Sequence, residues 1–312
     1  MNKIYMQEVC SRDGFQNEQT FIQTEDKINI INQLSLCNFA KIEVTSFTSP
    51  KAIPALRDAE EVMKGIKRQP GTEYSVLVPN LRGAERALTC NIDEANLVMS
   101  CSESHNLANL RMSREASFAQ LSQVINVIEG SSVAINVSLS TAFGCPFEGD
   151  VSENTVIKLI ERFARQNVRG ITLCDTTGMA YPSQVSSLCQ AVKQEFPHLE
   201  ITLHFHDTRG MALANTLAAL NSGIDRFDAS TGGLGGCPYA PGASGNVSTE
   251  DMVHMLELMG YITEVDLNKL LIISKTLPSY VGHEVNGSIV RAGKRSDLHP
   301  LPSSLVQKIA SN

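Results

Sequence analysis

Short apolar runs alternate with longer amphipathic segments over most of this chain. Eight runs have the length and the β-branched content that are typical of buried strands. They lie at residues 4–9, 42–46, 74–78, 95–99, 133–139, 170–174, 201–205 and 226–229. Apolar residues at helical spacing occur between and after them, at residues 24–37, 117–128, 152–165, 182–196, 212–222, 252–259 and 267–277. The pattern therefore predicts repeated strand–helix units followed by C-terminal helices.

Eight such units in one chain favour an α/β fold of the (β/α)8 TIM-barrel type, with the C-terminal helices packed beside or beneath the barrel. A doubly wound sheet is the alternative, but its first strand usually leads into a glycine-rich phosphate turn. Here the first strand leads into Cys10-Ser11-Arg12-Asp13-Gly14, which lacks that pattern. Thr24 is a candidate N-cap, and Pro182 suits the first turn of a helix.

The length bounds the domain organisation. A chain of 312 residues fits one barrel, and we expect a single TIM-barrel domain with C-terminal helices over residues 1–292. Residues 293–312 are largely polar and carry Pro300 and Pro302. We expect this tail to be loosely ordered or to cover a neighbouring surface.

Charge and cysteine content exclude several classes of protein. The net charge of -7 argues against nucleic-acid binding, which needs clustered Lys and Arg. No apolar run is long enough for a transmembrane helix, so no membrane partner is expected. Eight scattered cysteines without a C-x-x-C pair, and an N-terminus without the pattern of a signal peptide, are typical of a reduced, cytoplasmic protein.

The segment Leu203-His204-Phe205-His206-Asp207 is the most informative. Side chains alternate along a strand, so His204 and His206 point to the same side at its end. Two imidazoles so placed can bind one metal ion, and a pair of hydrogen-bonded core histidines is an equally good interpretation of this motif alone. The other strand ends favour the metal.

Catalytic groups of a (β/α)8 barrel lie where the strands end. Six of the ends here carry charged or polar groups, which are costly as plain core. They are Arg12 and Asp13; Glu43, Thr45 and Ser46; Asn80; Asp175 and Thr176; His204, His206 and Asp207; and Asn246 in the loop after the last strand.

Asp13, His204, His206 and Asn246 offer two nitrogens and two oxygens, a set that suits an octahedral Mg²⁺ or Mn²⁺ ion. Zinc is the rival, although structural zinc prefers cysteine. Asp175 or Glu43 could orient these ligands, or could form an ion pair with Arg12 that shapes the pocket; both interpretations stay open.

Two further features suggest chemistry on a substrate. The guanidinium of Arg12 can stabilise negative charge that develops on an oxygen, although a salt bridge at the barrel mouth is the alternative. Residues 231–246 contain six glycines, which suit a mobile lid, and Cys237 within them could carry a proton.

These motifs resemble the 3-hydroxy-3-methylglutaryl-CoA lyase family, which belongs to the metal-dependent TIM-barrel lyases and is related to the isopropylmalate-type synthases. The resemblance runs from about Val9 to about Leu270 and depends most on the loop from Gly232 to Asn246. The motifs are Ser11-Arg12-Asp13-Gly14-Phe15-Gln16-Asn17-Glu18, Ile42-Glu43-Val44-Thr45-Ser46, Phe143-Gly144-Cys145-Pro146-Phe147-Glu148-Gly149, Leu203-His204-Phe205-His206-Asp207-Thr208 and Gly232-Gly233-Leu234-Gly235-Gly236-Cys237-Pro238-Tyr239.

The resemblance implies residue roles. Asp13, His204, His206 and Asn246 would be metal ligands, Arg12 would stabilise an enolate, and Cys237 would be the lid thiol. Glu43 would contribute to catalysis. The residues expected to contact or order the acyl-CoA substrate are Arg12, Gln16, Asn80, Asp175, Thr176 and Glu250.

The implied reaction is a retro-Claisen cleavage of 3-hydroxy-3-methylglutaryl-CoA to acetyl-CoA and acetoacetate, with Asp13 or His204 as base. The alternatives are the same chemistry on another 3-hydroxy diacid thioester, a Claisen-condensing synthase, or a non-catalytic metal-stabilised barrel. Gln19, Ala108 and Arg111 depart from the family pattern in loops that would touch the acyl-CoA. A homodimer is expected because exposed barrel helices often pair.

Overall fold

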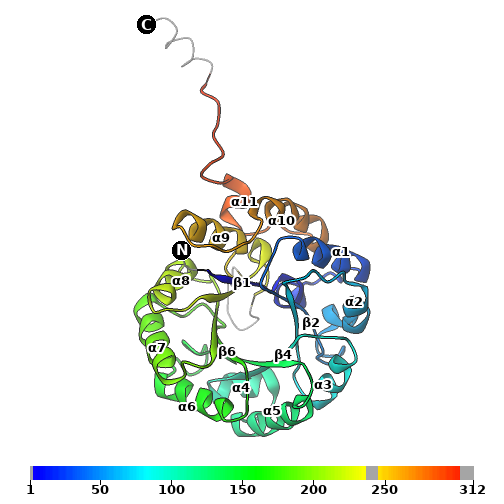
Figure 1. Ribbon diagram of the computed structural model, residues 1–312, viewed down its shortest axis with the longest axis vertical. Coiled ribbons are helices and arrows are strands. Elements are labelled where there is room, and N and C mark those ends of the chain that lie inside the picture. The colour runs from blue at the N-terminus through cyan, green and yellow to red at the C-terminus, as the bar shows by residue number, and fades with distance from the viewer. Residues whose placement is uncertain (1–2, 237–244, 303–312) are drawn as a thin grey trace, which may run out of the picture.

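Eight parallel strands form a closed barrel in chain order, and hydrogen bonds between β1 and β8 close it (Figure 1). The computed structural model describes residues 3–236 and 245–302. Every strand lies within one residue of its predicted bounds, so the TIM-barrel prediction is confirmed. The strands are β1 Tyr5–Glu8, β2 Lys41–Ser46, β3 Glu73–Leu77, β4 Glu94–Ser100, β5 Ala134–Ser140, β6 Gly170–Asp175, β7 Glu200–Phe205 and β8 Arg226–Ala229.

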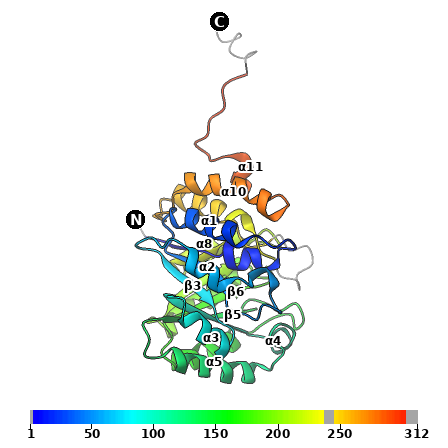
Figure 2. The same ribbon diagram turned by 90° about the vertical axis from the view of Figure 1, so that its right-hand side faces the viewer.

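Helices surround the barrel (Figures 1 and 2), and they include all seven that the periodicity predicts. Four other helices in the described part of the chain were not predicted, because they are short or lack a clear apolar stripe. The predicted helices are α1 Thr24–Ser35, α5 Arg114–Ile128, α6 Glu153–Ala164, α7 Pro182–Glu195, α8 Ala212–Asn221, α9 Thr249–Leu258 and α10 Leu267–Val281; the others are α2 Ala59–Gly65, α3 Leu81–Leu88, α4 Glu103–Leu110 and α11 Ser288–Ala292.

The two helix-start predictions have different outcomes. Pro182 is the first residue of α7, as its fixed φ favours. Thr24 is not an N-cap: Gln23 occupies that position, and Thr24 is already the first helical residue of α1. The Thr24 hydroxyl instead donates a hydrogen bond to Asp58 Oδ2 at 2.8 Å, so a tertiary contact uses the side chain that capping would need.

Charged side chains close the end of the barrel where the strands begin. Lys41, at the start of β2, donates to Glu94 Oε1 of β4 at 2.7 Å. Arg169 bridges Glu94 and Glu73, the latter at 2.5 Å. These opposite charges neutralise one another, so this end is stabilised internally and the opposite end is left for chemistry.

The C-terminal helices α9, α10 and α11 lie together on one side of the barrel (Figures 1 and 2). Residues 293–302 form no helix or strand and lead away from it. The predicted character of the tail also concerns residues 303–312, which lie outside the described residues. Among the residues described, no helix combines the length and apolarity that crossing a membrane requires.

Candidate metal and active site

A one-turn π-helix at residues Cys10–Gly14 places Arg12 and Asp13 at the open end of the barrel. The amides of Arg12, Asp13 and Gly14 all converge on the carbonyl oxygen of Val9, at 2.7–3.3 Å. Single π-turns are frequent at functional sites because they turn consecutive side chains away from the regular helical spacing. Here the turn brings two adjacent charged residues into one cavity.

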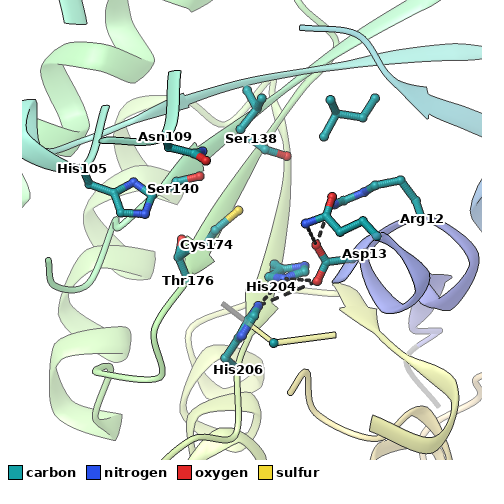
Figure 3. Close-up of a pocket in the computed structure, with 14 residues that line it drawn as sticks. Arg12, Asp13, His105, Asn109, Ser138, Ser140, Cys174, Thr176, His204 and His206 are labelled. Carbon is teal, nitrogen blue, oxygen red and sulfur yellow. Dashed lines mark hydrogen bonds and ion pairs between the residues drawn. The ribbon is translucent and has the colours of Figure 1, made fainter. Parts of the chain in front are cut away.

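Asp13, His204 and His206 form a buried cluster with the geometry of a metal site (Figure 3). The Nε2 atoms of the two histidines are 3.2 Å apart. Asp13 Oδ2 lies 4.0 Å from His204 Nε2 and 3.9 Å from His206 Nε2. One carboxylate oxygen and two imidazole nitrogens therefore face a common centre, so these side chains fit a divalent cation.

Asp228 orients this cluster and was not predicted from the sequence. It lies opposite His204 in the β7–β8 pairing, and its Oδ2 is 3.1 Å from His204 Nδ1. A carboxylate that accepts the Nδ1 hydrogen leaves the Nε2 lone pair free for a metal. The available signal was an acidic residue in the short apolar strand at residues 226–229.

Electrostatics keep Asp13 and His206 in the forms that bind a cation and make His204 more basic. Burial and the neighbouring His204 lower the pKa of His206 to about 4, so its imidazole is neutral near pH 7. Burial disfavours the carboxylate of Asp13, but Arg12 and the two imidazoles outweigh burial and hold its pKa below the usual range. Burial has the largest single effect on His204 and lowers its pKa, but the hydrogen bond to Asp228 and the charges of Asp228 and Asp13 together outweigh burial, so the pKa of His204 is raised.

Asn246, the fourth predicted ligand, is in the cluster but presents its amide nitrogen to it. Nδ2 donates to Asp13 Oδ2 at 2.6 Å and to the carbonyl of Leu234 at 2.9 Å. The amide oxygen is buried and has no hydrogen-bond partner among the described residues. A buried amide oxygen that lacks a hydrogen-bond partner is unfavourable. Rotation of the Asn246 amide would turn this oxygen toward Asp13. Ligation by Asn246 stays a prediction.

Arg12 and Glu43 form a buried ion pair beside the cluster. Arg12 Nε donates to Glu43 Oε2 at 2.5 Å, and its Nη1 donates to Asp13 Oδ1 at 2.5 Å. Burial raises the pKa of Glu43, against the effect of Arg12. Of the two interpretations left open for Glu43, the structure therefore shows the ion pair, which holds the guanidinium in a fixed direction.

Asp175 forms no ion pair with Arg12 or with any other residue that the structure describes. Its Oδ1 accepts from the amides of Met179 and Ala180, at 2.7 and 3.1 Å, and its Oδ2 is buried without a hydrogen-bond partner. Burial raises its pKa to about 6. The alternative that paired Asp175 with Arg12 is therefore wrong, and the backbone contacts show that Asp175 shapes the loop after β6.

One cavity is lined by half of the predicted site residues together with several residues that were not predicted. The predicted ones that line it are Arg12, Asp13, Gln16, Thr176, His204 and His206. His105, Asn109 and Ser140 lie across the cavity from the two histidines (Figure 3). His105 is held by Ser100, whose Oγ is 2.7 Å from Nδ1. No role was predicted for these three side chains from the sequence.

Three predicted substrate contacts, Asn80, Asp175 and Glu250, are not among the described residues that line this cavity. Asn80 caps α3 by accepting from Gly83 N at 3.0 Å. Glu250 is fully buried, and its carboxylate accepts from Gly232 N and Ser248 Oγ, at 2.9 and 2.6 Å. Asn80 and Glu250 accept hydrogen bonds from nearby backbone amides and so order loops, and a contact of either with the substrate stays a prediction. Cys237 lies outside the described residues.

Glu8 supports the same glycine-rich segment and should make stability depend on pH. Burial raises its pKa to about 7, although hydrogen bonds from Thr231, Thr249 and Cys10 oppose the rise. The folded state then holds a proton more tightly than the unfolded chain between about pH 4.5 and 7. Protonated Glu8 therefore adds to the free energy of unfolding below that pH range. This contribution, up to about 3 kcal/mol, is lost as the pH rises through the range.

Glu8→Gln, which cannot titrate, tests this. The free energy of unfolding, measured with urea from pH 5 to pH 8, should fall with pH more steeply in the wild type than in the variant. Parallel curves would show that Glu8 does not hold an extra proton in the folded state.

The fold and the cluster together define a metal-binding (β/α)8-barrel protein with an Asp/His/His set at the ends of its strands. Residues 3–277 match the HMGL-like family. The chain belongs to this family, as the motifs predicted.

Curated relatives and solved structures agree. The chain is 50% identical over 280 residues to the hydroxymethylglutaryl-CoA lyase YngG of Bacillus subtilis, covering 90% of this chain and 94% of that protein. It is 39% identical over 290 residues to the human mitochondrial hydroxymethylglutaryl-CoA lyase, covering 93% and 89%.

The structure also resembles an HMG-CoA lyase from A. baumannii solved with coenzyme A and 3-methylmalate. The TM-score is 0.93 at 49% identity, covering 96% of this chain and 98% of that one. The carboxyl transferase domain of Rhizobium etli pyruvate carboxylase, at 18% identity and a TM-score of 0.69, shares the fold alone.

Proposed function

We propose that this protein cleaves 3-hydroxy-3-methylglutaryl-CoA to acetyl-CoA and acetoacetate. The observation that carries the proposal is the buried Asp13/His204/His206 cluster with Arg12 in the same cavity, in a chain that is 50% identical to a bacterial lyase of this name. Cavity, cluster and family point to one activity, so the synthase and the non-catalytic barrel become the weaker alternatives.

The cluster would hold a divalent metal, and we propose Mg²⁺ or Mn²⁺, because a carboxylate with two imidazoles and free positions for oxygen suits these ions. A bound ion would supply Lewis-acid polarisation of the substrate's oxygens. The residues that would bind it are Asp13, His204 and His206, with Asn246 after rotation of its amide.

The remaining chemistry belongs to side chains. Asp13 or His204 would take the proton from the tertiary hydroxyl, and the bond between C2 and C3 would break. C3 becomes the ketone carbon of acetoacetate, and the electron pair passes to the thioester enolate. Arg12 lies in the cavity with its direction fixed by Glu43, and it would hold the enolate oxygen. Cys237 or a water would then protonate C2.

Substrate contacts follow from the cavity. Gln16 and Thr176 line it and are proposed to contact the acyl-CoA. Asp175, Asn80 and Glu250 would act by ordering the adjoining loops. The A. baumannii lyase binds coenzyme A, which supports an acyl-CoA ligand for this chain of nearly identical fold.

The proposals beyond the site concern assembly and location. A homodimer remains our expectation, and Ile272 of α10, which is 65% exposed, is apolar surface that a second copy could cover. Light scattering on the purified protein measures the oligomer directly. The cytoplasm is proposed because the scattered cysteines suit a reducing compartment, and a bacterial relative covers most of the chain.

One assay tests the activity. The purified protein is chelated, given 3-hydroxy-3-methylglutaryl-CoA, and followed for acetoacetate release with and without Mg²⁺ or Mn²⁺. We expect release that requires the added ion. If metal binds and no acetoacetate appears, the activity is wrong, and other 3-hydroxy diacid thioesters should be tried, because Gln19, Ala108 in α4 and Arg111 just after it lie in segments expected near the acyl-CoA.

A further inference from the structure

The interior of the barrel contains a hydrogen-bonded polar network where (β/α)8 barrels usually have branched apolar side chains. Asn96 of β4 is at its centre and is 7% exposed. Its Nδ2 donates to Glu43 Oε1 of β2 at 2.8 Å, and this bond passes inside β3, which separates the two strands. Asn96 therefore reaches Glu43 through the barrel interior.

The amide of Asn96 is held in one orientation. Asn136 Nδ2 and Ser138 Oγ donate to Asn96 Oδ1, at 3.0 and 2.9 Å. Asn136 is held in turn, because its Nδ2 also lies 2.9 Å from Thr172 Oγ1. The Glu43 carboxylate can only accept, so a flipped Asn96 amide would place an oxygen against it and lose three favourable contacts. The orientation is thus set by partners on both sides.

Glu43 is in this way held from two directions. Asn96 binds Oε1, while Arg12 Nε binds Oε2 at 2.5 Å. The carboxylate cannot rotate without breaking a buried hydrogen bond, which costs about 1–3 kcal/mol in such surroundings. A fixed Glu43 fixes the guanidinium plane, and the direction of that plane decides whether Arg12 can meet charge that develops on the substrate.

We infer that Asn96 is a positioning residue for the lyase reaction: held by Asn136 and Ser138, it fixes Glu43, and Glu43 fixes Arg12. The inference rests on the proposed function. Asn96 does not line the cavity formed by the described residues, so it acts only through Glu43. It should therefore affect kcat and leave substrate and metal binding largely unchanged.

A matched control lies in the same interior. Gln7 Nε2 of β1 donates to Thr202 Oγ1 of β7 at 3.1 Å, and both side chains are buried. This bond also reaches across an intervening strand, but it is separate from the bonds that hold Glu43. Thr202→Val removes one interior hydrogen bond that does not hold Glu43. The change in its kcat therefore shows how much activity is lost when any interior hydrogen bond is broken.

The experiment measures kcat, KM, Mn²⁺ affinity and thermal unfolding for Asn96→Leu, Asn96→Asp, Thr202→Val, Glu43→Gln and the double variant Asn96→Leu/Glu43→Gln. Asn96→Leu should lower kcat about tenfold with KM within about threefold of the wild type, as expected when positioning alone is lost. Asn96→Asp keeps the size and the acceptor but opposes Glu43 with a second carboxylate, so its kcat should fall at least as far.

The double variant separates positioning from structure. If Asn96 acts through Glu43, the double variant should be no slower than Glu43→Gln alone, within about twofold, because residues that act as one unit are non-additive. Losses that multiply, or an Asn96→Leu kcat equal to that of Thr202→Val, would overturn the inference. If Asn96→Leu does not fold, Asn96→Asp carries the same test. A wild type without turnover would overturn the proposed function as well, which distinguishes the two failures.

Discussion

Lysine in place of Arg12 should lower kcat by about 10²–10³-fold, the usual cost of removing one donor that stabilises an oxyanion. The guanidinium bonds Glu43 through Nε and Asp13 through Nη1, both at 2.5 Å. A single ammonium on a flexible stem cannot keep both bonds and still present a donor to the substrate in a fixed direction. Turnover of 3-hydroxy-3-methylglutaryl-CoA at saturating substrate and metal measures the effect.

Metal binding should survive this change, because Arg12 contacts only Oδ1 of Asp13 while Oδ2 faces the histidines. Mn²⁺ titration of the variant provides that measurement. Arg226→Lys is a matched control, since Arg226 pairs with Glu200 at 3.0 Å at the strand starts, the end of the barrel away from the cluster. A near-normal kcat in the Arg12→Lys variant would remove Arg12 from the mechanism.

The strands could be predicted because each is a compact apolar run between polar segments, and every barrel strand is buried on both faces. The rule that strand ends carry the chemistry then brought together Arg12, Asp13, His204 and His206, which all line the cavity. These residues are detectable because charge at the end of an apolar run is unusual. Asn80 fits the same pattern and yet caps α3, so the pattern does not separate substrate contacts from capping groups.

Other parts of the site depend on contacts that one sequence does not reveal. The π-turn at Cys10–Gly14 arises from three amides that share the Val9 carbonyl, and no residue type specifies it. Asn96 meets Glu43 only because the barrel closes and brings non-adjacent strands face to face. His105 enters the cavity from α4, a helix of eight residues that periodicity did not detect. Closure of the barrel, rather than local pattern, assembles these contacts.

Asp228 is a charged residue within an apolar strand, and it meets His204 only through the pairing of β7 with β8. Its replacement gives the second large expected effect. Asp228→Leu should weaken metal binding about 10–100-fold, the usual cost of losing the partner that orients a ligating histidine. Without the carboxylate at 3.1 Å from Nδ1, His204 is free to adopt the tautomer whose Nε2 carries hydrogen and cannot bind a cation. Titration with Mn²⁺, followed by calorimetry or electron paramagnetic resonance, measures the affinity directly and needs no substrate.

Asp228→Asn distinguishes orientation from charge. Asparagine keeps an oxygen that can accept from Nδ1 but loses the negative charge, so it should retain more metal affinity than leucine does. Equal losses in the two variants would mean that the charge, rather than the hydrogen bond, holds His204 ready. Wild-type affinity in Asp228→Leu would contradict both explanations, because His204 would then be oriented by the barrel alone. Thermal unfolding of each variant without metal shows whether the barrel itself has been weakened.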